Sequence, residues 1–413
     1  MRTYWRLFSV VLLFVAPWPP RSLAQERATP NPVQFAAPIV IQYPASYPQA
    51  IASGDFTSDG FPDLIVGDEF GGLYTKLGRG DGRFKSWRYV FPPGHDVSAL
   101  ALGKFDGKNL DAVVNNISDA WVLMGGGGGG FPHDGWLDAG GNFVTGFAVG
   151  DFDHDGKQDI AALVDIPGQN SDSSEVYLYL GNGDGTFQSP RQLPVSPLGP
   201  VAILAGDFEG NGNLDLAVLS TYLHDHVGRV SVLLGDGKGN FGRPIVFPLN
   251  GLIPKYPVAM TLADFDGDET LDIALAYANS DATGSSFVQI LLGNGDGTFR
   301  RGARARAGLD PQAITTADFN GDGIPDLAVP DTTHQLTSSY LSILVGKGDG
   351  TFQPPAKFRV HGVGASGVTV ADFNGDGKPD VATVNVNSQN VSVLLNTTPF
   401  PAPKGRRARA QGH

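Results

Sequence analysis

Short apolar stretches of three to six residues alternate along the chain with segments rich in Gly, Asn, Asp and Pro. One stretch leads into an acidic loop, as at 201–205, and a second leaves such a loop, as at 272–276. A third stretch precedes a Gly-rich turn, as at 288–292, and a fourth follows the turn, as at 244–247. Short stretches rich in β-branched residues and bounded by turn formers are typical of β-strands. The pattern predicts four strands per unit, and no window of useful length has a helical period.

The four-strand unit recurs seven times. Each acidic stretch contains one Phe, and neighbouring copies are 47 to 57 residues apart. These residues are Phe56, Phe105, Phe152, Phe208, Phe265, Phe319 and Phe373. A fixed period of about 50 residues indicates a repeat protein. Seven units of four strands predict an all-β fold, a seven-bladed β-propeller with four-stranded blades.

The ends of the repeat region predict how the ring closes. The seventh unit ends at 391–395 without a fourth strand, whereas residues 35–42 have the pattern of a fourth strand but belong to no unit. Pairing the two segments would hide strand edges that otherwise favour aggregation. We therefore expect a ring closed by an N-terminal strand that completes the last blade.

The N-terminus has the pattern of a secretory signal peptide. Arg2 and Arg6 precede an apolar run at 7–16, and small residues mark a cleavage site near Ala24. The run is short for a membrane span, so a retained anchor is the weaker alternative. The sequence predicts a secreted protein, either periplasmic or extracellular. The expected parts of the chain are a signal peptide at 1–24, a disordered linker at 25–34, the propeller at 35–396 and a disordered basic tail at 397–413.

Charge and cysteine content narrow the class of partner. The formal net charge is −13, and loss of residues 1–24 would bring it to −16 because that segment holds three Arg and no acid. So acidic a chain is a poor partner for nucleic acid or an anionic membrane. The chain has no cysteine, so disulfides do not stabilise it, and bound metal ions are the candidate replacement. We expect a monomer with no membrane span.

Six of the acidic stretches have the spacing of a calcium loop. Side chains at positions 1, 3, 5 and 9, with a carbonyl at position 7, can converge on one ion, and Ca²⁺ takes six or more such oxygens. The predicted metal ligands are Asp55, Thr57, Asp59 and Asp63; Asp151, Asp153, Asp155, Lys157 and Asp159; Asp207, Glu209, Asn211 and Asp215; Asp264, Asp266, Asp268, Thr270 and Asp272; Asp318, Asn320, Asp322, Ile324 and Asp326; and Asp372, Asn374, Asp376, Lys378 and Asp380. The bidentate Glu that ends an EF-hand loop is missing.

The alternative is that these Asp and Asn residues only form turns, for which they are well suited. The ligand positions hold 20 of the 42 acidic residues, and turns alone do not require such a concentration of charge. We therefore expect about four to six calcium ions, with the loops at 55 and 207 the weaker sites. The second unit is one residue shorter and has Lys104 in place of the first Asp. We expect no ion there, and the Lys104 ammonium to stand in partly for it.

The loop Asp-Phe-Asn-Gly-Asp-Gly-Lys-Pro-Asp at 372–380 and its copies resemble the FG-GAP (VCBS-type) repeats of the integrin α head. The resemblance covers about residues 35–396 and implies calcium between the first two strands of a blade. The chain departs from integrins in lacking cysteines, leg domains, a membrane anchor and clean Gly-Ala-Pro segments. Its regular repeats look more like bacterial secreted proteins, in which the family is associated with adhesion, carbohydrate binding and extracellular enzymes.

Loops on the face opposite the calcium loops are the more varied, so we expect a carbohydrate or protein ligand there. The segments concerned are 68–70, 165–174, 222–226, Tyr277 and 332–335. Trp87, Trp121 and Trp136 are candidates for a sugar platform, with core packing the alternative for each.

No catalytic triad or nucleophilic cysteine is evident, and His224 and His226 lack a third zinc ligand. We expect a secreted, calcium-stabilised module for extracellular binding and adhesion. Two alternatives stay open: a secreted polysaccharide-active enzyme of lyase or dehydratase type, and a purely structural surface protein.

Overall fold

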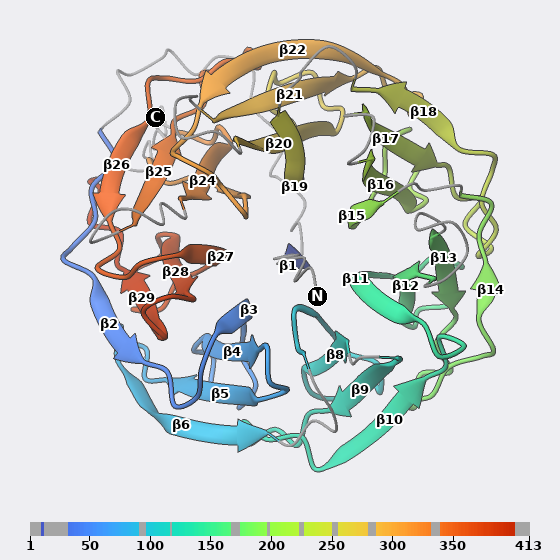
Figure 1. Ribbon diagram of the computed structural model, residues 1–413, viewed down its shortest axis with the longest axis horizontal. Helices are drawn as coiled ribbons and strands as arrows, with labels where there is room; N and C mark the ends of the chain where they lie inside the picture. Colours follow the sequence, from blue (N-terminus) through green and yellow to red (C-terminus); the bar gives the residue numbers. More distant parts are fainter. Residues whose placement is uncertain are drawn as a thin grey trace, which may run out of the picture.

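A ring of seven β-sheets surrounds a central channel (Figure 1). The structure, a computed structural model, describes residues 10–11, 32–90, 96–115, 118–166, 174–195, 199–222, 227–249, 255–279, 286–331 and 339–400. Within these ranges all regular structure is β, and no helix is long and apolar enough to cross a bilayer. The predicted all-β, seven-bladed propeller is confirmed.

Each blade is a sheet of four antiparallel strands, of which the first lies beside the channel and the fourth at the outer edge of the ring (Figure 1). Blades 1 to 4 contain β3 (Pro48–Gly54), β4 (Asp63–Asp68), β5 (Leu73–Gly78) and β6 (Phe84–Val90); β7 (Ala99–Gly103), β8 (Asp111–Asn115), β9 (Ala120–Met124) and β10 (His133–Leu137); β11 (Phe143–Gly150), β12 (Asp159–Asp165), β13 (Ser174–Tyr179) and β14 (Arg191–Gln192); and β15 (Pro200–Gly206), β16 (Asp215–Tyr222), β17 (Val227–Leu233) and β18 (Ile245–Pro248). Blades 5 to 7 contain β19 (Lys255–Ala263), β20 (Asp272–Asn279), β21 (Phe287–Gly293) and β22 (Phe299–Arg306); β23 (Thr315–Ala317), β24 (Asp326–Pro330), β25 (Tyr340–Leu344) and β26 (Ala356–Arg359); and β27 (Ala365–Ala371), β28 (Asp380–Asn385), β29 (Asn390–Leu394) and β2 (Ile39–Gln42).

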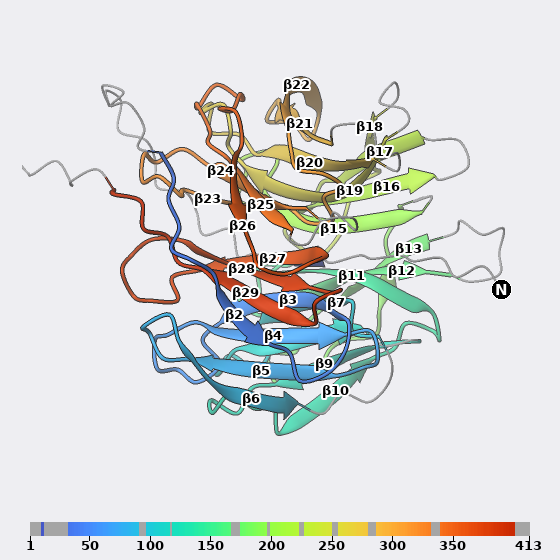
Figure 2. The same cartoon turned by 60° about the vertical axis from the view of Figure 1, so that its left-hand side comes forward.

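The ring closes between the two ends of the chain, as the sequence predicts. Strand β2 pairs antiparallel with β29, from Ile39 opposite Val393 to Gln42 opposite Asn390. Figure 2 shows this strand, in blue, lying along the outer side of the red blade. The last blade therefore contains both ends of the propeller, and neither β29 nor β2 is left as a separate unpaired segment.

The ordered ring extends slightly beyond the predicted bounds of 35 and 396. Val33 is buried against blade 6, and the Thr398 hydroxyl accepts a hydrogen bond from the Gln34 backbone N–H (2.9 Å). The Thr397 N–H donates to the Gln34 carbonyl (2.9 Å). These bonds join the two ends of the chain, so the parts predicted as linker and tail contribute residues 32–34 and 397–400 to the fold. The remainder of the predicted linker and tail lies outside the described residues.

One short strand comes from the predicted signal region. Strand β1 (Val10–Val11) pairs in parallel with Ala99 and Leu100 of β7 and lies in the central channel (Figure 1). Cleavage near Ala24 would remove it and leave every pair between blade strands in place.

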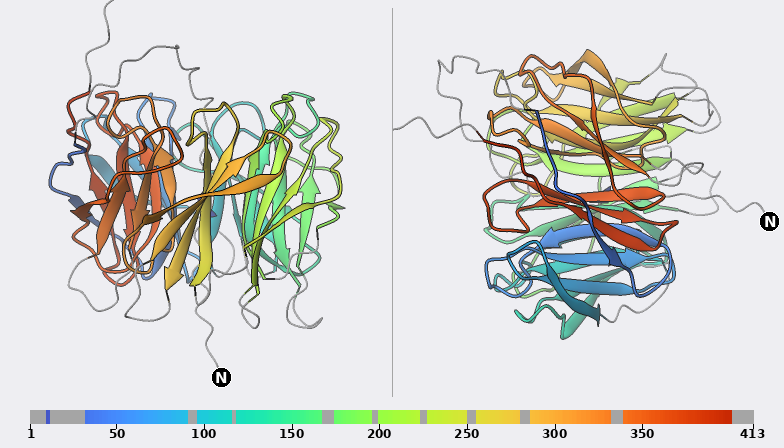
Figure 3. Two further views of the ribbon diagram at one scale, coloured as in Figure 1. Left: turned by 90° about the horizontal axis from the view of Figure 1, so that it is seen from above. Right: turned by 90° about the vertical axis from the view of Figure 1, so that its left-hand side faces the viewer.

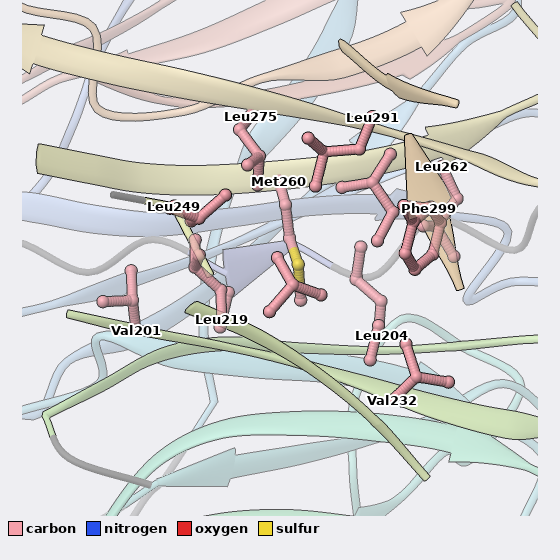
Figure 4. Packing of buried hydrophobic residues seen from close by; sticks show 14 of the residues in the cluster. Val201, Leu204, Leu219, Val232, Leu249, Met260, Leu262, Leu275, Leu291 and Phe299 are labelled. Carbon is pink, nitrogen blue, oxygen red and sulfur yellow. The ribbon is translucent and has the colours of Figure 1, made fainter. Parts of the chain in front are cut away.

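The hydrophobic core lies between blades rather than at one centre. Seven buried clusters each join neighbouring blades around the ring. Figure 4 shows the cluster between blades 4 and 5, where Leu219 and Val232 of one blade face Met260 and Leu275 of the next. In the edge-on views, neighbouring blades pack side by side, with the faces of their sheets toward each other (Figure 3). Each blade is therefore stabilised by apolar area that it shares with both neighbours.

A Phe–Phe contact connects each blade to the next. The Phe of each loop meets, at 5.5 to 6.1 Å between ring centroids, a Phe of the neighbouring blade. This second Phe follows the Gly-rich turn in six pairs and precedes β2 in the seventh. The seven pairs are Phe56–Phe131, Phe105–Phe187, Phe152–Phe241, Phe208–Phe299, Phe265–Phe352, Phe319–Phe35 and Phe373–Phe84. Most rings lie edge to face, the geometry that favours attraction between aromatic rings. The sequence predicts that these turn residues anchor a hairpin, and the structure shows that they also join blades.

We predict that Phe265→Ala lowers the free energy of unfolding by about 3–5 kcal/mol, because it leaves a cavity and removes the ring that meets Phe352. Phe265 is buried, whereas Phe70 is 62% exposed. Phe70→Ala, the matched control, is expected to change that free energy by less than about 0.5 kcal/mol. Urea unfolding followed by far-UV circular dichroism measures both, and equal effects would contradict the proposed coupling between blades.

Candidate metal centres

The acidic loops all connect the first and second strands of a blade, so they lie together on one side of the ring, which we call the loop face. The first Asp holds each loop closed from within. In all six loops its carboxylate accepts a hydrogen bond from the backbone N–H five residues later, for example from Gly156 to Asp151 (2.9 Å) and from Gly377 to Asp372 (2.7 Å). The loop backbone therefore already has the curvature that brings alternate side chains together.

In two loops, three carboxylates converge closely enough to share one cation. One oxygen from each carboxylate lies within 4.8 Å of the other two. The two clusters are Asp151, Asp153 and Asp155, and Asp264, Asp266 and Asp268. Burial, followed by the neighbouring carboxylate, raises the pKa of Asp153 and of Asp266. Each cluster has one basic side chain beside it, Lys157 at 2.6 Å from Asp155 and Arg300 at 2.9 Å from Asp266, so three carboxylates face one positive charge. Closely spaced hard oxygen donors with net negative charge fit a divalent cation such as Ca²⁺.

The other four loops have the same backbone but an uncharged side chain at position 3 or 5. Asn320 donates to Asp322 (3.0 Å), Asn211 donates to Glu209 (2.9 Å), and the Thr57 hydroxyl lies 3.3 Å from Asp55. Each contact places an amide or hydroxyl proton beside a carboxylate. These loops therefore have fewer carboxylates at positions 1, 3 and 5 than the two clusters, while their oxygen donors remain suitable for calcium.

The N–H of the seventh loop residue donates to the side chain of the fifth residue in all six loops. The acceptor is a carboxylate at 2.9–3.0 Å in five loops and the Asn211 amide oxygen at 2.8 Å in the sixth. The donating residues are Phe61, Lys157, Asn213, Thr270, Ile324 and Lys378. The side chains of Lys157 and Lys378 also place an ammonium 2.6 and 3.3 Å from the same carboxylates. A bound cation would share these carboxylates with the ammonium groups or displace them.

The ninth residue, a predicted metal ligand, also has a structural role. The Asp159 carboxylate is buried and bridges two backbone groups: Oδ2 accepts from the Phe152 N–H (2.8 Å) and Oδ1 from the Gly181 N–H (2.7 Å). The same bridge occurs in all seven blades, where the residues are Asp63, Asp111, Asp159, Asp215, Asp272, Asp326 and Asp380. It links the start of the loop to the start of the turn. We call it the aspartate bridge.

The aspartate bridge does not depend on a calcium loop. Blade 2, whose loop is short, forms it with Asp111, which accepts from Phe105 N–H and Gly125 N–H, both at 2.7 Å. The role expected of Lys104 falls to Lys108, whose Nζ lies 3.3 Å from Asp106 Oδ2. The ninth Asp therefore orders the backbone of every blade, whether or not the loop has the full set of ligands.

Burial raises the pKa of these bridging carboxyl groups, although their backbone hydrogen bonds act in the opposite direction. The pKa is raised to about 6 for Asp63, Asp159 and Asp215, and to about 7 for Asp272 and Asp380. The other acidic residues of the same loop raise the pKa further in each case. A bound divalent cation would favour the ionised form of these groups.

The opposite face is only partly described. Residues 167–173, 223–226 and 332–338, which include most of the predicted ligand loops, lie outside the described residues, as do His224 and His226. Asp68 is buried and accepts from the N–H groups of Phe70 and Gly72, so it shapes its own turn. Tyr277 was predicted in a loop but is a buried residue of β20, because that strand runs on to Asn279.

The rim of the ring, which we define as the seven outer strands β6, β10, β14, β18, β22, β26 and β2, carries two exposed aromatic residues. The sequence names Trp136 as a candidate for a sugar platform but does not single out Tyr89. Trp136 is 61% exposed and lies opposite Trp121 in the β9–β10 pair. Tyr89 is 54% exposed and occupies the equivalent position of blade 1, opposite Tyr74. Trp87, by contrast, donates to the Gln42 carbonyl (2.7 Å) and helps to join β6 to β2.

The closed ring of seven four-stranded blades, each with an aspartate bridge and six with an acidic loop, defines a repeat propeller in which two loops could hold a cation. The sequence matches FG-GAP-like repeats at residues 55–114, 163–218, 274–329 and 335–383, so the chain belongs to the FG-GAP-like repeat family. No curated protein matches the chain.

Solved structures share the fold at low sequence identity. BBS1N in complex with ARL6DN, from a mercury-soaked crystal, is 10% identical, with 91% of this chain and 98% of the other covered and a TM-score of 0.58. In a lead-soaked crystal of the same complex, BBS1N is 11% identical, with 88% of this chain and 96% of the other covered and a TM-score of 0.57. A lectin of Agrocybe aegerita, described as recognising non-reducing terminal N-acetylglucosamine, is 17% identical over 87% of each chain, with a TM-score of 0.48.

We predict that the metal-free protein loses stability as pH rises from about 4 to about 7. Asp272 and Asp380 have a raised pKa of about 7 in the folded protein, so the folded state holds protons that the unfolded chain has already released above its ordinary pKa. Asp55 and Asp155 have a lowered pKa, so their effect on stability falls below about pH 4, outside this range. Chemical unfolding in chelator at several pH values measures the trend. Saturating calcium should reverse it, because ions bind the ionised carboxylates. Stability that rises with pH in chelator would contradict this assignment.

Proposed function

We propose that this protein is a secreted, calcium-stabilised propeller that acts as an extracellular binding and adhesion module, with carbohydrate as the ligand class. The observation that carries the proposal is the pair of exposed aromatic rings, Tyr89 and Trp136, at equivalent positions on the rims of blades 1 and 2. An aromatic ring with one apolar face in solvent and hydrogen-bonding groups beside it is a typical surface for partner recognition.

The surroundings of Tyr89 support this assignment. Tyr74 lies 5.2 Å from Tyr89 and 6.4 Å from Trp87, and Tyr43 contacts both Tyr74 and Trp87 at 5.3 Å. The Lys76 ammonium lies 4.8 Å above the Trp87 ring. These contacts fix the rings of the group, so that a ligand would meet a rigid platform and lose little binding energy to ordering of the protein.

A shallow cavity lies beside the platform. Its volume is about 270 Å³, and it is lined by Arg88, Tyr89 and Val90 of β6 together with the Gly-rich segment 126–132 of blade 2. The Arg88 guanidinium donates to the Gly128 carbonyl (2.8 Å), which holds the segment against blade 1. The size of the cavity and its mixture of aromatic, charged and backbone groups suit one sugar unit of a longer chain.

Calcium and secretion complete the proposal. Calcium in the acidic loops would neutralise the loop face and stabilise the blades without contacting the ligand at the rim. The pattern of residues 1–24 supports export, and stabilisation by ions in place of disulfides is compatible with an extracellular location.

We predict calcium-dependent binding on an array of glycans, stronger in calcium than in chelator because the ions order the blades that carry the rim. Tyr89→Ala and Trp136→Ala are each expected to weaken the strongest signals about tenfold, the loss of about 1.4 kcal/mol. Val246→Ala is the matched control, since Val246 is 49% exposed at the equivalent rim position of blade 4. An array without hits from a protein that melts higher in calcium would overturn the carbohydrate assignment and leave the fold intact.

A further inference from the structure

Basic residues are concentrated on the rim of this acidic protein. The seven outer strands contain nine Lys or Arg residues and one acid, Asp134. Four of the nine, Arg300, Arg301, Arg304 and Arg306, lie on β22 of blade 5 (Figure 1). The chain as a whole carries 42 acidic and 29 basic residues, so this distribution creates a positive strip on a negative molecule.

A β-bulge places three of these arginines on one side of the blade. Arg301 lies opposite Leu291, Arg304 opposite Gln289 and Arg306 opposite Phe287, with a register shift between the first two pairs. Leu291, Gln289 and Phe287 are alternate residues of β21 and face one side of the sheet. Without the extra residue in β22, Arg301 and Arg304 would point to opposite sides. Arg300 lies opposite Leu292, on the other side.

Gln289 holds the bulge and aims Arg304. Its buried side chain donates to the carbonyls of Gly302 (2.9 Å) and Ala303 (3.2 Å), the two residues of the bulge. Its Oε1 accepts from Arg304 Nε (2.9 Å). The equivalent residue is Ser in three other blades, namely Ser231, Ser342 and Ser392. Blade 5 therefore differs by one buried amide that serves both the bulge and an exposed arginine.

The arginines rest on aromatic rings at the edge of the core that Figure 4 shows. The Arg304 guanidinium lies 4.9 Å above Phe287, which is stacked on Tyr277 at 4.7 Å. Arg301 lies over Phe247 of blade 4 and donates to the Pro248 carbonyl (3.2 Å). The Tyr277 hydroxyl is buried and has no hydrogen-bond partner among the described residues. Stacking leaves the outward N–H groups of Arg304 available to a ligand.

The two sides of β22 differ in how their arginines are paired among the described residues. Arg300, on the other side, is paired with Asp266 at 2.9 Å. Within the described part of the chain, Arg304 and Arg306 have no carboxylate partner. Arginine rather than lysine is used at all four positions, and its planar fork suits two-point hydrogen bonding to a carboxylate.

We propose that the side of β22 that faces blade 4 binds a polysaccharide that carries carboxylates, a uronic acid polymer, through Arg304 and Arg306, with Arg301 adding positive charge beside them. Neighbouring arginines on this side are about 7 Å apart, two ladder steps along the strand. This site is separate from the aromatic platform of blades 1 and 2 and recognises a different chemical feature.

Two other polyanions fit less well. Duplex DNA carries a charge every 1.7 Å or so along its axis, far denser than the arginines, and a protein of net charge −13 repels it. An acidic peptide that added to the edge of β22 as a further strand would meet a bulge and exposed charges, the features that prevent strand addition. A sugar chain needs only the side chains.

The test is fluorescence anisotropy with short, end-labelled hyaluronan oligosaccharides and the full chain in calcium. The wild-type protein should bind, more weakly as salt increases, and should not bind the same oligosaccharides after methyl esterification of their carboxylates. Arg304→Ala combined with Arg306→Ala should weaken binding about tenfold or more. Gln289→Ser, which leaves the charge unchanged, should also weaken binding because Arg304 loses its support.

Two controls separate this site from general charge. Arg300→Ala should change affinity less than about twofold, well below the tenfold that 1.4 kcal/mol represents. Lys357→Ala combined with Arg359→Ala removes the same charge as the main variant from the rim of blade 6 and should likewise have little effect. Four results would each overturn the proposal. They are equal losses of affinity in these control variants, equal binding of the esterified sugar, tighter binding of duplex DNA or poly-Glu, and no binding by the wild type. If the main variant aggregates but still binds the sugar, the proposal is also wrong. The arginines would then serve to prevent strand addition at the edge of β22. Tyr89→Ala should leave uronate binding intact, so the experiment tests this site independently of the aromatic platform.

Discussion

The aspartate bridge is the interaction on which the rest of the structure depends. One buried carboxylate in each blade accepts a hydrogen bond from the N–H of the loop Phe and another from the residue that begins the turn. Both N–H groups lie where β-sheet pairing has ended, and a buried N–H without a partner is costly. The bridge satisfies both and fixes the distance between loop and turn. Because all seven blades have it, the propeller does not need a complete calcium loop in every blade.

The bridge also connects the blades to one another. By holding its N–H, it sets the position of the loop Phe, whose ring contacts the Phe after the turn of the next blade. The carbonyl of the same residue accepts from a turn glycine of that next blade, as from Gly185 to Phe105 (3.1 Å) and from Gly239 to Phe152 (2.9 Å). These glycines have φ of +88° and +71°, so the turn reaches across with a conformation that few other residues adopt. Order in one loop is thereby transmitted to its neighbour, and calcium bound on the loop face would stiffen the rim as well.

The sequence was sufficient to predict the ring, the closing strand and the loops, because each depends on a local pattern repeated seven times. Strand register and burial depend on residues far apart in the sequence, so the sequence pattern could not predict them. Asp159 has the spacing of a metal ligand, and only its burial and its two N–H partners reveal the bridge. The bulge that aligns Arg301 with Arg304 depends on Gln289 of the neighbouring strand, and Tyr277 was placed in a loop because the length of β20 cannot be judged from its apolar residues alone.

The central hypothesis is that the acidic loops hold calcium and that the ninth Asp, itself a predicted ligand, orders the blade with or without an ion. The most direct test is to count calcium ions per chain by native mass spectrometry, with melting temperatures measured in parallel. The wild type should bind four to six ions, and Asp155→Asn should bind one fewer. Asp111→Asn should keep the full count but melt lower, because leaving a backbone N–H of the bridge unpaired costs about 1–3 kcal/mol. A wild-type chain that binds no calcium, or an Asp111→Asn chain that loses an ion and keeps its melting temperature, would contradict the account.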